Sequence, residues 1–129
     1  MVTIVDYGMG NIGSVYNMFR KIGSKCIITS QIPDIENAEK IVLPGVGAYD
    51  SGMEQLENLG LKDVIRKKAL EDQIPMLGIC LGAQLMLAES EEGNKKGLGL
   101  LGVRLSGLIF QDCQNPRRFL TWAGIWCQI

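Results

Sequence analysis

The sequence has 129 residues, and its 47% hydrophobic and 21% charged content is typical of one soluble globular domain. Its formal net charge of −1 gives no reason to expect nucleic acid or an anionic membrane as a partner. No apolar run is as long as a membrane span and no signal peptide precedes the first strand-like residues, so we expect a cytoplasmic location.

The first half of the chain alternates short apolar runs with one amphipathic stretch. Ile12, Val15, Phe19 and Ile22 recur at helical spacing, which predicts a helix that Gly23 ends. Apolar, β-branched runs predict strands, and a stretch containing Pro33 predicts a loop. The predicted elements are strands at 2–5, 26–29 and 41–43, a helix at 11–22 and a loop at 31–37.

The second half continues the alternation with two helices, a strand and a further helix. The segment 52–59 predicts a short helix, and 61–69 a second one whose charged triplet Arg66–Lys68 we expect mostly on the solvated face. The apolar run 74–79 predicts a buried strand, and the helix formers of 84–89 predict the helix after it.

Strands that alternate with helices indicate an α/β fold with a mostly parallel sheet flanked by helices. In such sheets, ligands bind beyond the carboxyl ends of the strands. The turns at Gly8, Gly45 and Cys80 all follow strands, so we expect them to form one site.

Cys80 lies in the run Gly78-Ile79-Cys80-Leu81-Gly82, between the predicted strand and helix. This pattern has the form of a nucleophile elbow with Cys in place of Ser, in which a tight backbone requires small neighbours and exposes the side chain. A helix N-terminus there favours the thiolate. The alternative is that Cys80 is a small buried hydrophobic residue, as free cysteines usually are.

The turn Pro44-Gly45-Val46-Gly47 follows the third predicted strand. Its two glycines free the backbone to direct an N–H group into the site, as an oxyanion hole requires. The N–H of Leu81 would be the second donor. A plain turn is the alternative interpretation, and it would be favoured if Cys80 were absent.

Gly8, Gly10 and Gly13 match the G-x-G-x-x-G pattern after a strand and before a helix, which suggests a dinucleotide site. The acidic residue that should hold the ribose is missing from the end of the second strand, and the nearest acid, Asp34, follows in a loop. We therefore favour a tight turn over a nucleotide site.

Four segments in this order resemble the class I (triad-type) glutamine amidotransferases, and over about residues 1–101 the glutaminase subunits of imidazole glycerol phosphate synthase in particular. The segments are 6–11, 44–47, 78–85 and 90–93. The resemblance implies a flavodoxin-like fold, a glutamyl thioester on Cys80 and an oxyanion held by the N–H groups of Gly47 and Leu81. It also implies glutamine binding by Gly45, Val46, Gln84 and Glu92.

The same resemblance implies a (β/α)8-barrel synthase partner that receives the ammonia, in a heterodimer serving histidine biosynthesis, with no cofactor. A related group aminates a surface-polysaccharide sugar, and the segment 13–19 leans toward that group. Three further alternatives remain open: a nucleotide-binding module, a non-catalytic domain that docks on a partner, and an unrelated cysteine hydrolase.

The sequence departs from the family in its triad and its C-terminal part. The family's thiol needs a histidine base and a glutamate that orients it, but this sequence has no histidine and no glutamate after Glu92. The absence of histidine also excludes a histidine-based metal site, and four cysteines without CxxC spacing predict reduced thiols and no metal. We therefore expect this polypeptide to be inactive alone.

We divide the chain into an amidotransferase part, 1–101, and an aberrant tail, 102–129. Suitable codons for 119–125, read one frame away, encode the family segment Pro-His-Met-Gly-Trp-Asn, which predicts a single-base frameshift near Leu101 to Val103. We expect the fold to be incomplete for this reason. Sequencing the gene tests the idea, since an uninterrupted frame encoding Trp122 would refute it.

Overall fold

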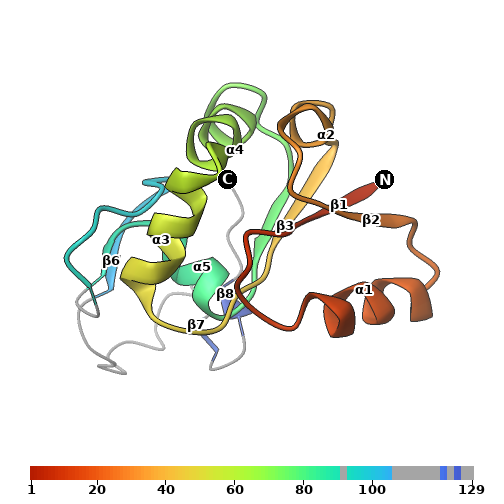
Figure 1. Cartoon of the computed structure of the whole chain (residues 1–129), viewed down its shortest axis with the longest axis horizontal. Coiled ribbons are helices and arrows are strands. Elements are labelled where there is room, and N and C mark those ends of the chain that lie inside the picture. Colours follow the sequence, from red (N-terminus) through yellow and green to blue (C-terminus); the bar gives the residue numbers. More distant parts are fainter. Residues whose placement is uncertain (91–92, 106–119, 122–123, 126–129) are drawn as a thin grey trace.

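The protein is built on a four-stranded parallel sheet, seen in a computed structural model that describes residues 1–90, 93–105, 120–121 and 124–125. The strand order is β2-β1-β3-β4, so the chain crosses over between neighbours as in other α/β proteins (Figure 1). The strands are β1 (Val2–Val5), β2 (Cys26–Thr29), β3 (Lys40–Leu43) and β4 (Met76–Gly78). This confirms the α/β class and the parallel sheet.

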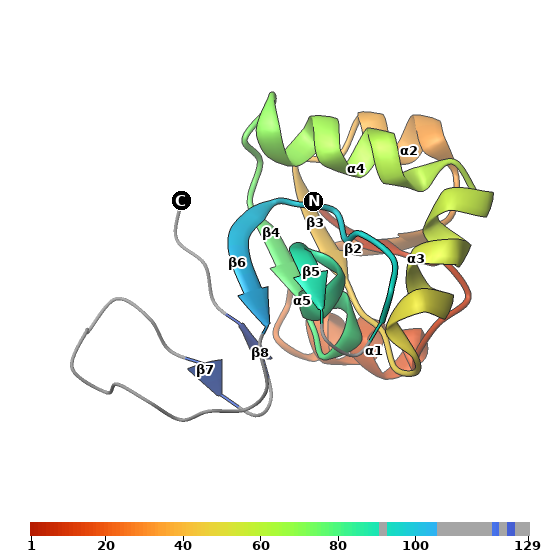
Figure 2. The ribbon, with the colours of Figure 1, turned by 90° about the vertical axis from the view of Figure 1, so that its left-hand side faces the viewer.

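Five helices accompany the described strands and divide between the two faces of the sheet. They are α1 (Ile12–Lys21), α2 (Ile32–Glu36), α3 (Tyr49–Asn58), α4 (Leu61–Leu70) and α5 (Leu81–Leu85). Helices α2 and α4 lie together on one face, and α1 lies on the other, beside β2 (Figures 1 and 2). None of these described helices is long and apolar enough to cross a membrane.

Two further strand pairs follow α5. β5 (Leu87–Ser90) pairs in parallel with β6 (Leu101–Leu105), and β7 (Leu120–Thr121) forms a short antiparallel pair with β8 (Gly124–Ile125). Figure 2 shows β5 and β6 next to α5. Most of the tail 102–129 lies outside the described residues, so its aberrant origin stays a prediction.

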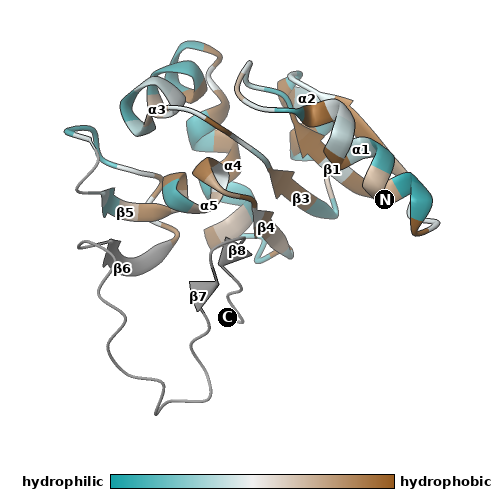
Figure 3. Cartoon of the chain, turned by 90° about the horizontal axis from the view of Figure 1, so that it is seen from below, coloured by the Kyte–Doolittle hydropathy of each residue, from teal (hydrophilic) through white to brown (hydrophobic). Residues whose placement is uncertain are grey.

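The main core lies between the sheet and the helices α2, α3 and α4. Because successive strand residues face opposite sides, Ile41 and Leu43 of β3 enter this core while Val42 faces the α1 side. The brown strands in Figure 3 show how apolar the sheet is. Helix α1, all ten residues of which are described, buries none of them.

Two predicted segments are wrong. The expected loop at 31–37 contains α2, because Pro33 falls in the first turn, where a helix needs no backbone N–H from it. The expected helix at 84–89 is replaced by α5, which ends at Leu85, and by β5, which the distant β6 holds in an extended conformation.

The charged triplet on α4 is also not uniformly solvated, because Lys68 is only 8% exposed. Its ammonium group donates to the carbonyl of Glu36 at the end of α2 (3.0 Å) and pairs with Asp72 (2.8 Å). Lys68 thus joins two helices through a polar contact at the edge of the core.

Candidate active site

Cys80 sits on a strained turn between β4 and α5. Its φ of 55° and ψ of −118° are unusual for a residue with a side chain, as expected of a nucleophile elbow, and its thiol is free and exposed. Among the described residues, the other free cysteine is Cys26, which is half-buried. The exposed position of Cys80 contradicts the alternative of a buried core cysteine.

The glycines on both sides of Cys80 are required by close backbone contacts. A Cβ atom on Gly78 would lie 2.5 Å from Cα of Ala83, and one on Gly82 would collide with the carbonyl oxygen of Leu43. A hydrogen bond from the N–H of Ile79 to that same carbonyl (3.0 Å) ties the turn to β3. The structure therefore confirms the small-residue requirement of the elbow.

The turn of residues 44–47 lies directly against the elbow. Gly45 is buried, its Cβ position being 3.1 Å from Cβ of Leu81, whereas Val46 is 56% exposed. Gly47 adopts a φ of 125°, which favours glycine, and is exposed. These residues and Cys80 therefore share one end of the sheet, as the parallel topology predicts.

One of the two expected oxyanion donors is already engaged. The N–H of Leu81 donates to the carbonyl oxygen of Gly45 at 3.2 Å, and Leu81 is only 1% exposed. The N–H can hold a developing negative charge only after this bond opens.

The turn at Gly8 lies beside the turn of residues 44–47. The Cβ position of Gly10 is 3.1 Å from Cα of Gly45, so a side chain there would crowd the neighbouring turn. The first turn of α1 is capped by the side chain of Asn11, which accepts from the N–H of Ser14 (3.2 Å). Asp34 lies in α2 rather than in a loop, and its carboxylate accepts a hydrogen bond from the hydroxyl of Thr29, the last residue of β2 (2.6 Å).

The structure describes three of the four residues predicted to bind glutamine. Gln84 is half-buried on α5, and its N–H donates to the carbonyl of Cys80 at 3.2 Å. Glu92 lies outside the described residues. Its role, like those of Gly45 and Val46, stays a prediction.

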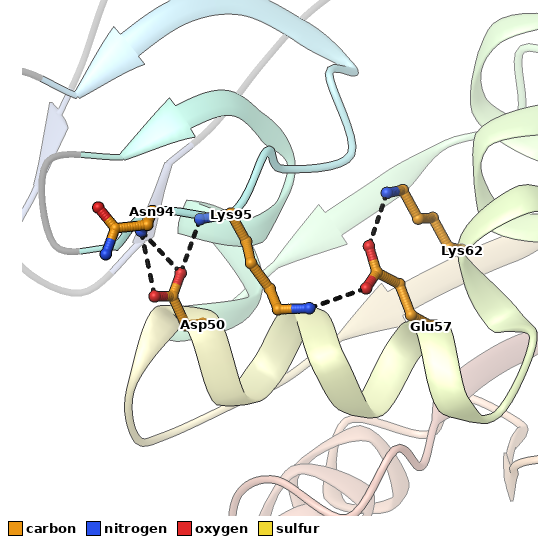
Figure 4. A network of polar contacts seen from close by, with 5 residues as sticks. All are labelled: Asp50, Glu57, Lys62, Asn94 and Lys95. Atoms are coloured by element: carbon orange, nitrogen blue, oxygen red, sulfur yellow. Dashed lines mark hydrogen bonds and ion pairs between the residues drawn. The ribbon is translucent and has the colours of Figure 1, made fainter.

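Sequence reasoning missed Asp50, which anchors the segment following Glu92. Its carboxylate accepts from the N–H of Asn94 (2.9 and 3.1 Å) and of Lys95 (2.9 Å), and the ammonium of Lys95 continues to Glu57 (3.0 Å; Figure 4). The backbone N–H groups of Lys95 and Asn94 hold the pKa of Asp50 below its ordinary value. Gly93 is a sequence signal for this contact, because a Cβ there would crowd the Asp50 carboxylate.

Besides the thiol of Cys80, acyl transfer needs a general base, and a metal ion is another group that could assist it. The sequence contains no histidine that could act as base. Within the described residues, no cluster of three Cys, Asp or Glu side chains could hold a metal ion. Two hollows of about 190 and 290 Å³ lie at the amino ends of the strands, around Met1, and include neither Cys80 nor Gly45.

The comparisons with known proteins identify the family of this chain. Residues 3–104 match the model of the family described as glutamine amidotransferase class-I. A relative from Methanococcus maripaludis, named imidazole glycerol phosphate synthase subunit HisH 2, is 51% identical over 104 residues, which are 81% of this chain and 52% of the relative. A relative of the same name from Pseudomonas aeruginosa is 46% identical over 77% of this chain and 49% of its own length.

Among solved structures, one titled crystal structure of glutamine amidotransferase superimposes with a TM-score of 0.67 at 20% identity, covering 81% of this chain and 55% of the other. That likeness shows the fold. The chain spans about half the length of the curated relatives it matches. With the family model covering most of the sequence, the chain belongs to the class I glutamine amidotransferases.

Proposed function

We propose that Cys80 is the nucleophile of a glutaminase site that releases ammonia from glutamine. The observation that carries the proposal is the strained, exposed thiol of Cys80 on a turn held by Gly78 and Gly82, next to the turn at Gly45. The names of the relatives, which are subunits of imidazole glycerol phosphate synthase, support glutamine as the substrate and histidine biosynthesis as the pathway.

In the proposed reaction, the Cys80 thiolate attacks the side-chain carbonyl carbon of glutamine and forms a C–S bond. The C–N bond then breaks, and the nitrogen leaves as ammonia after it takes up a proton. Water attacks the resulting thioester, which yields glutamate and the free thiol. The N–H groups of Gly47 and Leu81 stabilise the oxyanion, once the Leu81 bond to Gly45 has opened.

The 129 residues lack the base that this reaction requires. Without histidine, the chain has no imidazole that could take the thiol proton and return it to the leaving nitrogen. Loss of triad members costs orders of magnitude in rate, so we expect very slow turnover by this polypeptide alone. A base supplied from outside these residues would restore it.

We further propose that the ammonia passes to a barrel-shaped (β/α)8 synthase subunit in a cytoplasmic heterodimer, without a cofactor in this chain. A surface-sugar aminating enzyme is the alternative acceptor, suggested by the segment 13–19. Among the described residues, the Cβ position of Gly13 meets the side-chain oxygen of Asn11 at the ordinary contact distance of 3.9 Å, so packing does not explain why a glycine stands there.

The direct test is covalent labelling by a diazoketone analogue of glutamine, followed by intact mass and peptide mapping. We expect one adduct on Cys80, protection by excess L-glutamine but not by L-asparagine, and no adduct in Cys80→Ser. Labelling of Cys26 at an equal rate, or no protection by glutamine, would refute the proposed substrate. Rapid ammonia release by the chain alone would refute its inactivity.

A matching experiment identifies the acceptor. The chain is mixed with each purified candidate synthase, and complex formation and ammonia-dependent product are measured. Binding to the histidine-pathway barrel supports our proposal, whereas binding only to the sugar-aminating synthase supports the alternative. Binding to a barrel without labelling of Cys80 by the analogue would indicate a non-catalytic docking domain.

A further inference from the structure

Asp50 joins two segments that lie far apart in the sequence. It belongs to the first turn of α3, which begins two residues after the turn of residues 44–47. Its carboxylate accepts hydrogen bonds from the backbone N–H groups of Asn94 and Lys95, at 2.9 to 3.1 Å (Figure 4). A charged acceptor makes a stronger hydrogen bond with a backbone N–H than a neutral one does. Asp50 therefore holds the segment that begins at Gly93 against the start of α3.

The contact leaves no room for a side chain at residue 93. A Cβ atom on Gly93 would lie 2.7 Å from Cδ1 of Tyr49 and would overlap the Asp50 carboxylate. The N–H of Gly93 donates to the carbonyl of Ser90 in a long hydrogen bond (3.5 Å), and Ser90, the last residue of β5, is 7% exposed. Both described ends of the segment 90–93 are therefore held, one by β5 and the other by α3.

Helix α3 also packs against the helix that follows Cys80. Gly52 is buried in α3, and a Cβ atom there would lie 3.2 Å from Cδ2 of Leu81 and 3.1 Å from Cδ1 of Leu85, both in α5. The first two turns of α3 thus adjoin three parts of the proposed glutamine site: the turn before the helix, the elbow helix α5 and the segment that ends at Gly93.

We propose that Asp50 is a positioning residue for glutamine, because its contact sets the distance between the segment 90–93 and the turn of residues 44–47. The inference rests on the proposed function and on the predicted contacts of glutamine with this turn and with Glu92. Two segments that are fixed before a ligand binds lose less conformational entropy when it does. Asp50 therefore acts on the affinity for glutamine and not on the reactivity of the Cys80 thiol.

Glu57 supplies a matched control. It lies two turns further along α3, and its carboxylate accepts from the ammonium groups of Lys95 (3.0 Å) and Lys62 (2.8 Å; Figure 4). Glu57→Gln removes a negative charge from the same helix and the same network, but it leaves the backbone N–H groups of the segment on Asp50. The two substitutions therefore separate the loss of the backbone anchor from the loss of a charge.

The test is the concentration dependence of Cys80 labelling by the diazoketone analogue of glutamine, measured on the full chain at pH 7. In Asp50→Ala, we expect the half-saturating concentration to rise about five- to twentyfold, while the maximum labelling rate and the rate of alkylation by iodoacetamide stay within about twofold. Asp50→Asn keeps one acceptor oxygen and should lie between Asp50→Ala and the unmodified chain. Glu57→Gln should match the unmodified chain.

An unchanged half-saturating concentration in Asp50→Ala, or an equal rise in Glu57→Gln, would overturn the proposal. A fall in the maximum labelling rate alone would do so too, since partial unfolding gives that result. If Asp50→Ala folds poorly, Gly93→Ala disturbs the contact from the other side and should give the same rise. Labelling that glutamine does not prevent in the unmodified chain defeats the proposed function, whereas equal half-saturating concentrations in a chain that glutamine protects defeat only the role of Asp50.

Discussion

The two faces of the four-stranded sheet are covered very differently. On one face, α2, α3 and α4 enclose a core in which Ile41, Leu43 and Leu56 are at most 1% exposed. On the other face, α1 buries none of its residues, and Ile22 just after it is 69% exposed. Stability and the geometry of the elbow therefore depend on the first face, while α1 follows its own amphipathic pattern with little support from packing.

The largest expected effect comes from opening the packed face. Leu56→Ala should lower the free energy of unfolding by about 2–5 kcal/mol, because it leaves a cavity between α3 and its neighbours. Ile22→Ala is the control on the α1 side, and it should change stability by no more than about 0.5 kcal/mol. Urea titration followed by far-ultraviolet circular dichroism measures both. Equal losses of unfolding free energy in the two variants would contradict the difference in packing between the two faces of the sheet.

The next effect concerns two glycines with opposite surroundings. Gly82→Ala forces a methyl group into the carbonyl of Leu43 and should destabilise the chain by about 1–3 kcal/mol or more, while changing the alkylation rate of Cys80. Gly13→Ala, on the open α1 side, should instead stabilise by about 0.5–1 kcal/mol, since alanine favours a helix. The midpoint of thermal unfolding and the alkylation rate of Cys80, measured for both variants, test the difference between the two sites. A tolerated Gly82→Ala would contradict the elbow geometry.

A smaller loss of stability is expected when the buried ammonium group of Lys68 on α4 is removed. Lys68→Ala leaves the carbonyl of Glu36 without its donor and should cost about 1–3 kcal/mol. The exposed neighbour Lys67→Ala should be within about 0.5 kcal/mol of the unmodified chain. If both substitutions cost the same, Lys68 does not join α2 to α4.

The smallest expected effect is the pH dependence contributed by Asp50. Because the folded state holds the pKa of Asp50 below its unfolded value of 3.8, its contribution is fully present above that value. It is lost as the pH falls through the lower, folded pKa. Asp50→Asn should therefore lower the midpoint of thermal unfolding at pH 7, and the difference should vanish in acid. Hydrogen exchange at the amides of Asn94 and Lys95 should be faster in the variant at pH 7, and unchanged exchange would contradict the anchor.

Local patterns were sufficient to predict much of the fold. The β-branched runs correctly indicated β1 and β2, and the apolar stripe of 12–22 predicted α1. Tertiary context explains the errors. Leu87 and Glu89 favour a helix in isolation, but the distant β6 pairs with them. Pro33 is compatible with the first turn of α2.

The candidate site was predictable where topology alone decides it. Parallel strands bring Cys80, Gly45 and Gly47 to one edge, and the glycine pattern around Cys80 marks the elbow. The bond from the Leu81 N–H to Gly45, and the contact of Asp50 with the segment that begins at Gly93, depend on distances of a few ångströms between segments far apart in sequence. No local pattern contains that information.

The aromatic residues offer a spectroscopic consequence of this packing. Tyr7 and Tyr49 are both in the enclosed core, whereas the two tryptophans, Trp122 and Trp126, belong to the segment 102–129. The third tyrosine, Tyr16, is half-buried on α1, so tyrosine absorbance should report mainly on the melting of the core, and tryptophan emission on the last segment alone. If that segment lies outside the amidotransferase part, as we predict, the two optical signals need not share a transition midpoint.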